Sequence, residues 1–534
     1  MLKKIRVVLS VIIFSLITFF FLDFAGILPW RFHSLAHIQF VPALLALNFG
    51  ILTFLVLLTL LFGRIYCSSI CPMGVFQDIV AWISKRTAKK KKKYSYSPPK
   101  TILRWSILIA TVVLYLFGIT TLLGLLDPYA AYGRMATHLF KPVYMAGNNL
   151  LAAIFMSFGN YKFYFVDIFV FSFFSLIVSV VTFLGVGFLA WKYGRTFCNT
   201  ICPVGTILGV LSRFSLFKIR IDTDKCTSCG VCAAKCKASC IDFKGKKVDN
   251  NRCVDCFNCM GSCKFSALSY KQKMFGKKEK KIMSDVAFDR IGNALGDAFN
   301  HSFSKQPETA TIDKGKRRFL LASATAAIAT PTLLAKEKAS LLNGGISYTR
   351  QTPISPPGAL STEQFQSRCS SCHLCISKCP TNVLKPAFTE YGIGGVMQPV
   401  MFFEKSFCNF DCTICSNVCP NQALKSLTKE EKHKTQMGHV VFIEDICIVP
   451  TKLKSCGACA EHCPTQAVKM VPYKNGLTIP VIKTDICVGC GACEFICPVR
   501  PHRAIFVEGN KVHIEAKPFI TEAKKEIKID DFGF

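Results

Sequence analysis

The stretches CTSCGVCAAKC at residues 226–236 and CVDCFNCMGSC at residues 253–263 each hold four cysteines, with gaps of two, two and three residues. The C-terminal part of the chain repeats this arrangement four times, and two of these copies have a first gap of three or eight residues. The six quartets are Cys226, Cys229, Cys232 and Cys236; Cys253, Cys256, Cys259 and Cys263; Cys369, Cys372, Cys375 and Cys379; Cys408, Cys412, Cys415 and Cys419; Cys447, Cys456, Cys459 and Cys463; and Cys487, Cys490, Cys493 and Cys497. They take up 24 of the 29 cysteines in 534 residues, and such regularity indicates metal binding, not the disulfides of a short secreted scaffold.

The spacing of each quartet favours an iron–sulfur cluster over zinc. Two gaps of two residues let a tight loop wrap three corners of a cubane, and the third gap starts a short helix aimed at a neighbouring site. Four-cysteine zinc knots use paired Cys-x2-Cys and do not need a third cysteine at the next step. Proline follows the fourth cysteine in the four C-terminal quartets, whereas Lys237 and Lys264 follow it in the first two. The sequence therefore predicts six [4Fe–4S] clusters.

The two quartets before residue 264 have the pattern of bacterial two-cluster ferredoxins. In that pattern the fourth cysteine of each run binds the other cluster. We therefore expect Cys263 to complete the first cluster and Cys236 the second, with Cys240 as a buried apolar residue. The pairing among the four C-terminal quartets stays open.

Composition places part of the chain in a bilayer. Hydrophobic residues make up 51% of the chain and charged residues 18%, whereas soluble domains have about a quarter charged residues. Apolar runs cover residues 7–28, 41–62, 102–126 and 166–191, and each reaches the roughly 20 residues needed to cross a bilayer. The first run has no small-residue cleavage site, so we favour an uncleaved span over a signal peptide. Disorder and a single soluble domain are both excluded.

The formal charge of +32 would ordinarily suggest nucleic acid as a partner. Six clusters on thiolates, at about −2 each, would lower it to roughly +20. The excess also lies in loops beside apolar runs, above all in residues 85–100, which hold eight basic residues and no acidic ones. By the positive-inside rule the N-terminus and the segment after the fourth run face the cytoplasm, and no nucleic-acid partner is expected.

A repeat lies at the end of two of these runs. Residues 63–74, GRIYCSSICPMG, match residues 194–205, GRTFCNTICPVG. A duplicated two-span unit would bring the two Cys-x3-Cys-Pro motifs together, so that Cys67, Cys71, Cys198 and Cys202 hold a metal or form a redox dithiol. The alternative is a proline-ended helix cap with small buried cysteines.

Residues 273–313 form a polar linker, and residues 314–336 begin with Arg317-Arg318 before a weakly apolar stretch. This resembles a twin-arginine export signal in mid-chain, and export of folded cargo suits a domain whose clusters are assembled inside the cell. The alternative is a peripheral helix that leaves all six clusters in the cytoplasm. His373 also completes a Cys-x-x-Cys-His pattern of haem attachment, but it lies inside a full quartet, so we interpret the match as incidental. The ten histidines lie outside the apolar runs, so no haem is expected in the membrane.

The whole chain resembles two families joined end to end. Residues 1–272 resemble the NapH-type membrane quinol dehydrogenase component, and residues 314–515 resemble the NapG-type periplasmic ferredoxin; the MauN and MauM pair has the same layout. The resemblance implies electron transfer from menaquinol or ubiquinol in the quinone pool to a periplasmic reductase or cytochrome, with nitrate reductase as the leading candidate. One alternative is a membrane ferredoxin that acts in assembly or metal reduction for another complex. The other is a redox sensor, which lacks support because no DNA-reading or kinase motif is present.

Quinol oxidation needs an apolar slot and a group that takes a proton, a task suited to histidine. His33, His37 and Gln39 follow the first apolar run at the outer membrane edge and are the candidates; ordinary interfacial residues are the alternative.

The predicted fold class is a membrane α-helical bundle of four spans and a fifth crossing, with α+β bacterial ferredoxin-like domains. The predicted parts are a membrane domain (1–219), a cytoplasmic two-cluster ferredoxin (220–272), the linker (273–313), the signal-like segment (314–336), a periplasmic four-cluster ferredoxin (350–515) and a tail (516–534). The predicted location is the bacterial inner membrane, with residues 226–263 cytoplasmic and 350–534 periplasmic.

Overall fold

The computed structural model describes residues 2–28, 34–87, 93–169, 172–272 and 350–518. The predictions for His33, for the linker and signal-like segment at 273–336 and for the tail after residue 518 lie outside these residues. The described parts of residues 1–271, 349–499 and 503–534 belong to one compact unit.

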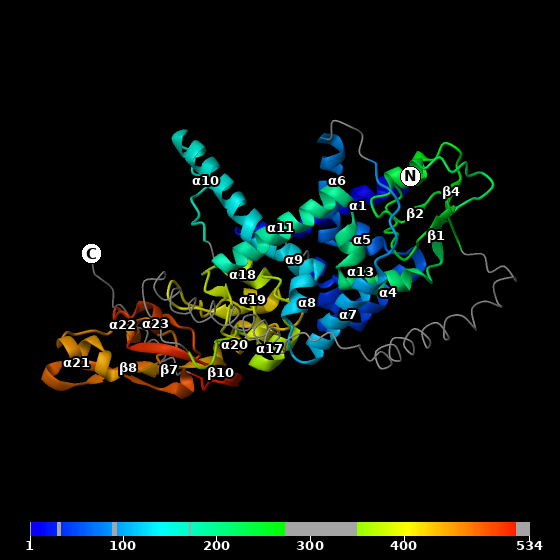
Figure 1. The fold of residues 1–534 in the computed structure, drawn as a ribbon. Helices are drawn as coiled ribbons and strands as arrows, with labels where there is room; N and C mark the ends of the chain where they lie inside the picture. The colour runs from blue at the N-terminus through cyan, green and yellow to red at the C-terminus, as the bar shows by residue number, and fades with distance from the viewer. Residues whose placement is uncertain (1, 29–33, 88–92, 170–171, 273–349, 519–534) are drawn as a thin grey trace, which may run out of the picture. The chain divides into compact units, whose positions relative to one another are not determined.

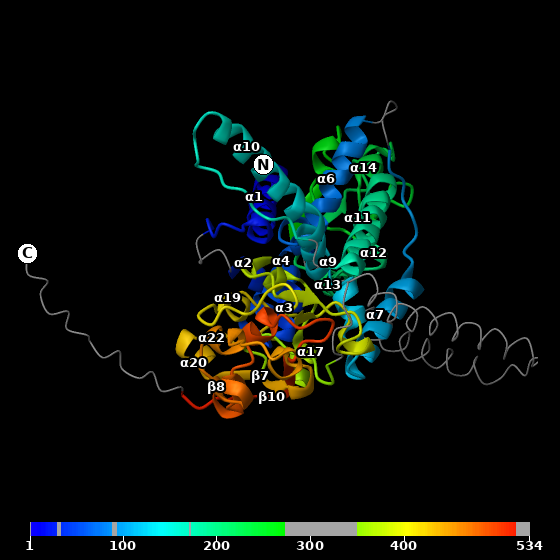
Figure 2. The same ribbon diagram turned by 90° about the vertical axis from the view of Figure 1, so that its left-hand side faces the viewer.

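Helices make up the N-terminal part as far as residue 212 (Figure 1). They are α1 (Leu2–Leu22), α2 (Ser34–His37), α3 (Phe40–Leu45), α4 (Phe49–Phe62), α5 (Ile65–Ser69), α6 (Pro72–Thr87), α7 (Thr101–Leu116), α8 (Thr121–Leu126), α9 (Pro128–Met135), α10 (Lys141–Ser157), α11 (Phe173–Tyr193), α12 (Thr196–Thr200) and α13 (Pro203–Ser212). A π-helical turn, η2 (Ala136–Phe140), joins α9 to α10. Among the contacts in this part, α11 lies beside α6 (Figure 2).

Three of the predicted apolar spans differ from the helices. The run 41–62 is divided between α3 and α4, because Leu47 has a left-handed φ of 52°. The run 102–126 is divided between α7 and α8 at Gly118, with a φ of 78°. The helix of the fourth run, α11, begins at Phe173 and not near residue 166. The backbone of Val166 is instead hydrogen-bonded to the side chain of Asn149. Within the described residues, α1 and α11 are long and apolar enough to cross a membrane.

The repeated motifs fold in the same way. In each copy a helix, α4 or α11, ends at a glycine; a five-residue helix, α5 or α12, follows, and a helix with proline at its start, α6 or α13, comes next. The glycines Gly63 and Gly194 have φ values of +77° and +76°. A Cβ atom would come within 2.3 Å of Asp255 Oδ2 at Gly63 and within 2.4 Å of the Lys237 carbonyl oxygen at Gly194. Glycine at these two turns lets the loops of the first ferredoxin segment approach the helices.

The ferredoxin segments consist of short elements around cysteine loops. Residues 217–272 form α14 (Val231–Lys235) and two two-stranded sheets. In these sheets β1 (Phe217–Ile221) pairs with β4 (Leu268–Gln272), and β2 (Ile241–Asp242) pairs with β3 (Lys247–Val248). Residues 350–518 form α17 (Thr362–Arg368), α18 (Leu374–Lys378), α19 (Ile414–Asn417), α20 (Lys429–His433), α21 (Ile448–Lys452), α22 (Ala458–Glu461) and α23 (Ala492–Ile496). Their strands pair as β5 (Leu384–Pro386) with β6 (Pro399–Met401), β7 (Thr435–Phe442) with β10 (Ile505–Glu515), and β8 (Val468–Pro472) with β9 (Thr478–Ile482).

Candidate metal centres

The cysteine loops with gaps of two residues share one backbone conformation. In each, the residue before the second cysteine and the residue after it have positive φ, a combination that curls the loop around its own centre. The pairs are Ser228 and Gly230, Asp255 and Phe257, Ser371 and His373, and Gly489 and Gly491. Among the described residues no three His, Cys, Asp or Glu side chains converge on a point suited to one metal ion. Three of the described cavities are instead lined by sets of cysteines.

Two of these cavities lie in the first ferredoxin segment. One cavity is lined by Cys226, Cys229, Cys232 and Cys263, and the other by Cys236, Cys253, Cys256 and Cys259. The structure thus groups the thiols in the crossed sets predicted from the spacing. Cys240 is 1% exposed and lines the second cavity, where its Sγ lies 3.5 Å from that of Cys236, in agreement with the buried position expected for it.

The C-terminal quartets also exchange their fourth cysteines, first with second and third with fourth. One cavity is lined by Cys447, Cys456 and Cys459 of the third quartet together with Cys497 of the fourth. Cys487, Cys490 and Cys493 lie near Cys463 in turn. In the first two quartets, Cys369, Cys372 and Cys375 lie near Cys419, and Cys408 and Cys415 lie near Cys379. The resulting sets are Cys369, Cys372, Cys375 with Cys419; Cys408, Cys412, Cys415 with Cys379; Cys447, Cys456, Cys459 with Cys497; and Cys487, Cys490, Cys493 with Cys463. This answers the pairing that the sequence left open. Four thiols around a hollow are the donor set of a [4Fe–4S] cluster.

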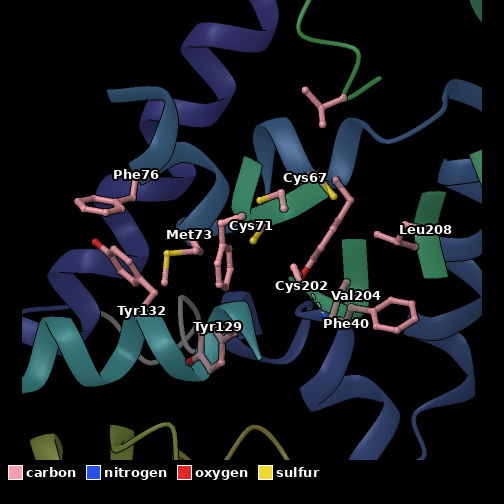
Figure 3. Packing of buried hydrophobic residues seen from close by; sticks show 14 of the residues in the cluster. Phe40, Cys67, Cys71, Met73, Phe76, Tyr129, Tyr132, Cys202, Val204 and Leu208 are labelled. Carbon is pink, nitrogen blue, oxygen red and sulfur yellow. Dashed lines mark hydrogen bonds between the residues drawn. The ribbon is translucent and has the colours of Figure 1, made fainter. Parts of the chain in front are cut away.

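The repeat brings its four cysteines, Cys67, Cys71, Cys198 and Cys202, into one buried group, in which each residue is 3–4% exposed. Figure 3 shows Cys67, Cys71 and Cys202 among the apolar side chains around them. We call these four residues the four-thiol centre. Bringing the two motifs together was the prediction from the duplication.

Cationic and amide groups face the sulfur atoms of the four-thiol centre. Nη2 of Arg64 lies 3.8 Å from Cys67 Sγ, and Nε2 of Gln77 donates to Cys198 Sγ at 3.1 Å. Arg64 and its repeat counterpart Arg195 are both fully buried. Burial raises the pKa of the thiols of Cys71, Cys198 and Cys202 above its ordinary value, and at Cys198 the two guanidinium groups and the Gln77 amide oppose that rise. The thiolate is the form that binds metal or reacts as a nucleophile.

A buried charge network adjoins this centre. The carboxylate of Asp78 forms ion pairs with Arg6 at 2.8 Å, Arg195 at 2.9 Å and Lys237 at 3.3 Å. Burial alone would raise the pKa of Asp78, but Arg195 and Lys237 hold that pKa well below its ordinary value. Asp78 therefore stays ionised and fixes Arg195, while Lys237 ties the network to the loop after Cys236.

One continuous cluster of buried side chains joins the ferredoxin segments to the four-thiol centre. It includes Cys256 of the first ferredoxin segment, the four-thiol centre, Tyr129 of α9 and Leu374 of the C-terminal domain, and Cys372 packs against it. Tyr129 is 1% exposed, and its hydroxyl has no hydrogen-bond partner among the described residues. The thiol groups on either side are thus linked through packed side chains, not through solvent.

Sequence reasoning missed a pair of histidines beside Cys372. Nε2 of His138, in the π turn η2, lies 2.8 Å from Nδ1 of His373, and Nε2 of His373 lies 2.8 Å from the Met397 carbonyl oxygen. Both imidazoles are buried, and burial lowers the pKa of His138 to about 4 and that of His373 well below its ordinary value. His373 is thus a structural partner of His138, a contact that the sequence did not predict. The helix geometry at η2 gave no signal in the sequence, although such π turns are frequent at functional sites.

The residues predicted to bind quinol are not all brought together. His37 in α2 is half-buried, and burial lowers its pKa although a backbone hydrogen bond at Pro420 opposes this. Gln39 is fully buried and points to the core, where its Oε1 accepts a hydrogen bond from the Tyr66 hydroxyl at 3.0 Å. His33 is not described, so a role for the three in quinol binding stays a prediction.

Comparison with known proteins supports the reading of the cysteine loops. A family model described as "4Fe-4S binding domain" matches residues 44–91 and 172–222, the segments that contain the two repeated motifs. A second, described as "4Fe-4S dicluster domain", matches residues 454–500. The methylamine utilization ferredoxin-type protein MauM of Methylorubrum extorquens is 30% identical over 152 residues, which are 27% of this chain and 67% of the relative. The chain belongs to the ferredoxin-type iron–sulfur proteins.

Other ferredoxin-type proteins show the same kinship. MauM of Methylobacillus flagellatus is 28% identical over 208 residues, which are 36% of this chain and 84% of the relative. The ferredoxin-type protein NapF of Escherichia coli is 29% identical over 157 residues, which are 29% of this chain and 87% of the relative. The expected similarity to the NapG and MauM ferredoxins is confirmed. No solved structure matches the chain. This ferredoxin-type protein carries 4Fe–4S domains for electron transport.

Proposed function

We propose that the protein is the quinol dehydrogenase component of a respiratory chain, which carries electrons from menaquinol or ubiquinol to a periplasmic reductase or cytochrome, nitrate reductase being the leading candidate. The observation that carries this proposal is the buried cluster that links cysteine sets of both ferredoxin segments through the four-thiol centre. Such a core gives a path for electrons that excludes water. The fused NapH-type and NapG-type layout would place the whole path in one chain.

The surfaces of the long helices support the proposal that the protein is inserted in the inner membrane. About a quarter of the most apolar window is buried in α1 (28%) and in α11 (22%). Large apolar side chains therefore face outward; Val181 and Leu184 in α11 are 63% and 61% exposed. A large exposed apolar surface on a helix needs lipid or a partner to cover it. Helices α4 and α7 are shorter than a bilayer requires by themselves, and we propose that α3 and α8 complete those two crossings.

A two-sided arrangement is supported by the two ends of α1. Near its start, Arg6 pairs with Asp78, which also holds Lys237 of the first ferredoxin segment. At its far end, the carbonyl oxygen of Phe21 accepts a hydrogen bond from Ser377 of the C-terminal domain at 2.6 Å. A helix of 21 residues is about 31 Å long at ~1.5 Å per residue, close to the thickness of the hydrocarbon core. The two ferredoxin segments would thus lie on opposite sides, with 226–263 cytoplasmic and 350–518 periplasmic.

We propose that the 24 quartet cysteines bind six [4Fe–4S] clusters in the crossed sets given above. Bound clusters would accept and release one electron at a time. The chain holds the thiols in tight loops, buries ten of these 24 cysteines and supplies backbone N–H groups. Cys419, for example, accepts hydrogen bonds from the backbone of Leu424 and Asn421. Such hydrogen bonds favour the anionic thiolate.

The four-thiol centre is proposed to complete the path between the two sides, either as a metal site or as a redox dithiol. The Arg64 guanidinium group lies near Cys67, and both Arg64 and Arg195 lie near Cys198. Tyr129 lies near Cys372 and belongs to the same buried cluster as the four-thiol centre. The guanidinium groups offset the negative charge that thiolates and electrons bring into a buried site. Without such a centre, the hydrocarbon thickness would separate the two ferredoxin segments.

Assembly or metal reduction for another respiratory complex is the second candidate function, because the buried four-thiol centre could hold a metal for such a role. Reaction with quinol separates the two. Protein purified without oxygen and oxidised under mild conditions would be mixed with menaquinol or ubiquinol, and cluster absorbance would be followed. Bleaching by either quinol, and none by the matching quinone, is expected. If dithionite bleaches the clusters but neither quinol does, the quinol dehydrogenase proposal is overturned.

A further inference from the structure

A cavity of about 740 Å³ lies where the end of α1 meets α10, the segment 164–169 and the C-terminal domain. Small-molecule sites in proteins have volumes of about 300–1,000 Å³, so this cavity has room for a quinone ring and the start of its tail. Its wall includes Cys379, which belongs to the set with Cys408, Cys412 and Cys415. A small molecule in this cavity would thus share a wall with a cluster thiol of the C-terminal domain.

The lining combines an apolar part with a few polar groups. Phe24, Met145, Tyr164 and Phe165 supply the apolar and aromatic surface that suits a ring and an isoprenoid tail. Lys141 is one of the polar groups in the lining. It is 6% exposed, and its Nζ donates a hydrogen bond to the carbonyl oxygen of Ser377. A predominantly apolar pocket with a few placed polar groups is the usual form of a site for such a ligand.

Charged groups in the same wall are fixed by pairing. Asp23 is 3% exposed, forms an ion pair with Lys378 at 3.1 Å and accepts the backbone N–H of Ile27 at 3.0 Å. Asp167 also lines the cavity, and it is exposed. The Asp23 carboxylate is therefore held by its ion pair and hydrogen bond, whereas the Asp167 carboxylate is accessible to water.

We propose that this cavity binds the quinol headgroup and delivers its electrons to the cluster of Cys379, Cys408, Cys412 and Cys415. The inference rests on the proposed quinol dehydrogenase function and names its substrate site. One quinol would become one quinone: two O–H bonds break, two electrons leave one at a time, and two protons pass to water, with the Asp167 carboxylate as the acceptor at the wall. A [4Fe–4S] cluster held by these four cysteines would take up the first electron and pass it to a further cluster before it takes up the second. The ammonium group of Lys141 binds the quinol oxygen that faces it.

The site differs from the one predicted from the sequence. His37 and Gln39 do not line this cavity; Gln39 instead bonds to Tyr66 in the core. A lipid chain is another conceivable occupant, because the apolar part of the wall would accept one. The position of Cys379 favours the quinol, since electron transfer weakens steeply with distance and a lipid would have no use for a cluster at its side.

The test fills the cavity by substitution in the full chain. Met145→Trp places an indole in the lining, whereas Val143→Trp changes a residue of the same helix that is 72% exposed and does not line the cavity. Met145→Trp should overfill the cavity and raise the ubiquinol concentration that gives half-maximal cluster reduction by about tenfold or more. Val143→Trp should leave this concentration unchanged. Dithionite should reduce both to the same extent, which shows that the clusters are intact. Tyr164→Ala supplies a second variant if Met145→Trp fails to fold, and it should weaken quinol binding in the same way.

Cross-linking with a photoreactive azidoquinone locates the quinol-binding site directly. Cross-linking to residues 141–145 or 164–169, lost with excess ubiquinol, is expected. Cross-linking confined to residues 34–39, or cavity variants that match wild type while quinol still reduces the clusters, would overturn the cavity as the site and leave the quinol dehydrogenase function standing. Labelling of the cavity by a photoreactive phospholipid that quinol does not displace would show that a lipid occupies it. If wild-type clusters do not react with quinol at all, the proposed function itself fails.

Discussion

The imidazole rings of His138 and His373, 235 residues apart in the chain, share a hydrogen bond of 2.8 Å between Nε2 of the first and Nδ1 of the second. The carbonyl oxygen of Met397 can only accept, so Nε2–H of His373 donates to it and Nδ1 of His373 is left as an acceptor. Nε2–H of His138 must then be the donor between the rings. Each ring is neutral because burial lowers both pKa values. The pair connects the π turn before α10 to the loop that carries Cys372.

Replacing His138 with Phe should destabilise the attachment of the C-terminal domain. The ring volume is kept, but Nδ1 of the buried His373 loses its donor, at a cost of about 1–3 kcal/mol. A lower midpoint of thermal unfolding and faster limited proteolysis are expected. His433→Phe is the control, because that imidazole pairs with Asp411 at the surface. Equal midpoints for wild type and His138→Phe would show that the histidine pair contributes nothing to the attachment.

The Asp78 network offers a second test of stability. Asp78→Asn removes the negative charge that Arg6, Arg195 and Lys237 share in a buried site, and breaking such a pair costs about 3–5 kcal/mol. A large fall in the denaturant concentration at the midpoint of unfolding is therefore expected. Asp222→Asn is the matched change at the surface, where the ion pair with Lys225 is largely exposed and contributes about 0–1 kcal/mol. Similar losses in the two variants would mean that the Asp78 network is not the anchor described.

The chemistry of the cysteine sets could be predicted from the sequence because it depends on local spacing. Loops with gaps of two residues curl in the same way wherever they occur, and the repeat at residues 63–74 and 194–205 predicted that its cysteines meet. The exchange of Cys379 with Cys419 could not be predicted, since it depends on how two separate loops pack. Hydropathy could not reveal the breaks at Leu47 and Gly118, because their causes are backbone angles and not apolar content.

His373 shows the same limit at the level of one side chain. The sequence places it in a cysteine loop, where the corresponding position is Gly230 in another quartet, and nothing near it marks a partner. Its partner His138 lies in a different part of the chain, so only the tertiary structure reveals the pair.

Cofactor content provides a third prediction. Six clusters correspond to about 24 iron atoms and as many sulfide ions per chain. Cys256→Ser should lose about four iron atoms, because Cys256 lines one of the cysteine cavities, whereas Cys240→Ser should retain all the iron although Cys240 lines the same cavity. Iron and acid-labile sulfide would be measured on protein purified without oxygen. Zinc in place of iron, or half this iron in a saturated preparation, would contradict the assignment.

Membrane topology is the subject of the fourth prediction. Reporter fusions after Tyr270 and after Arg350 should report opposite compartments, the first cytoplasmic and the second periplasmic. One end of α1 is joined to the first ferredoxin segment through Asp78, and the other end contacts the C-terminal domain. Replacing Arg317 and Arg318 with lysine should trap the C-terminal domain inside the cell if the twin-arginine route exports it. The same compartment for both fusions would refute the two-sided arrangement.

The four-thiol centre is tested by the double substitution Cys67→Ser and Cys198→Ser. Serine keeps the approximate size of the side chain but removes the thiolates that face Arg64 and Gln77. If quinol is oxidised at the outer end of α1, its electrons reach the C-terminal clusters without this centre but need it to reach the cytoplasmic ones. We therefore expect the double variant to keep all six clusters, to show normal reduction of the C-terminal clusters by quinol, and to lose reduction of the two cytoplasmic clusters.

The two cluster groups in that experiment can be separated by electron paramagnetic resonance, with the Cys256→Ser variant as the reference that identifies a cytoplasmic signal. Dithionite added to the double variant should still reduce every cluster, because it reaches the cytoplasmic ones from solvent: Cys229 is exposed. Reduction of the cytoplasmic clusters by quinol at the wild-type rate would mean that electrons do not pass through the four-thiol centre. The buried thiols would then have the alternative role of small side chains packed at proline-ended helix caps, and Arg64 and Arg195 would serve to position the loops of the first ferredoxin segment.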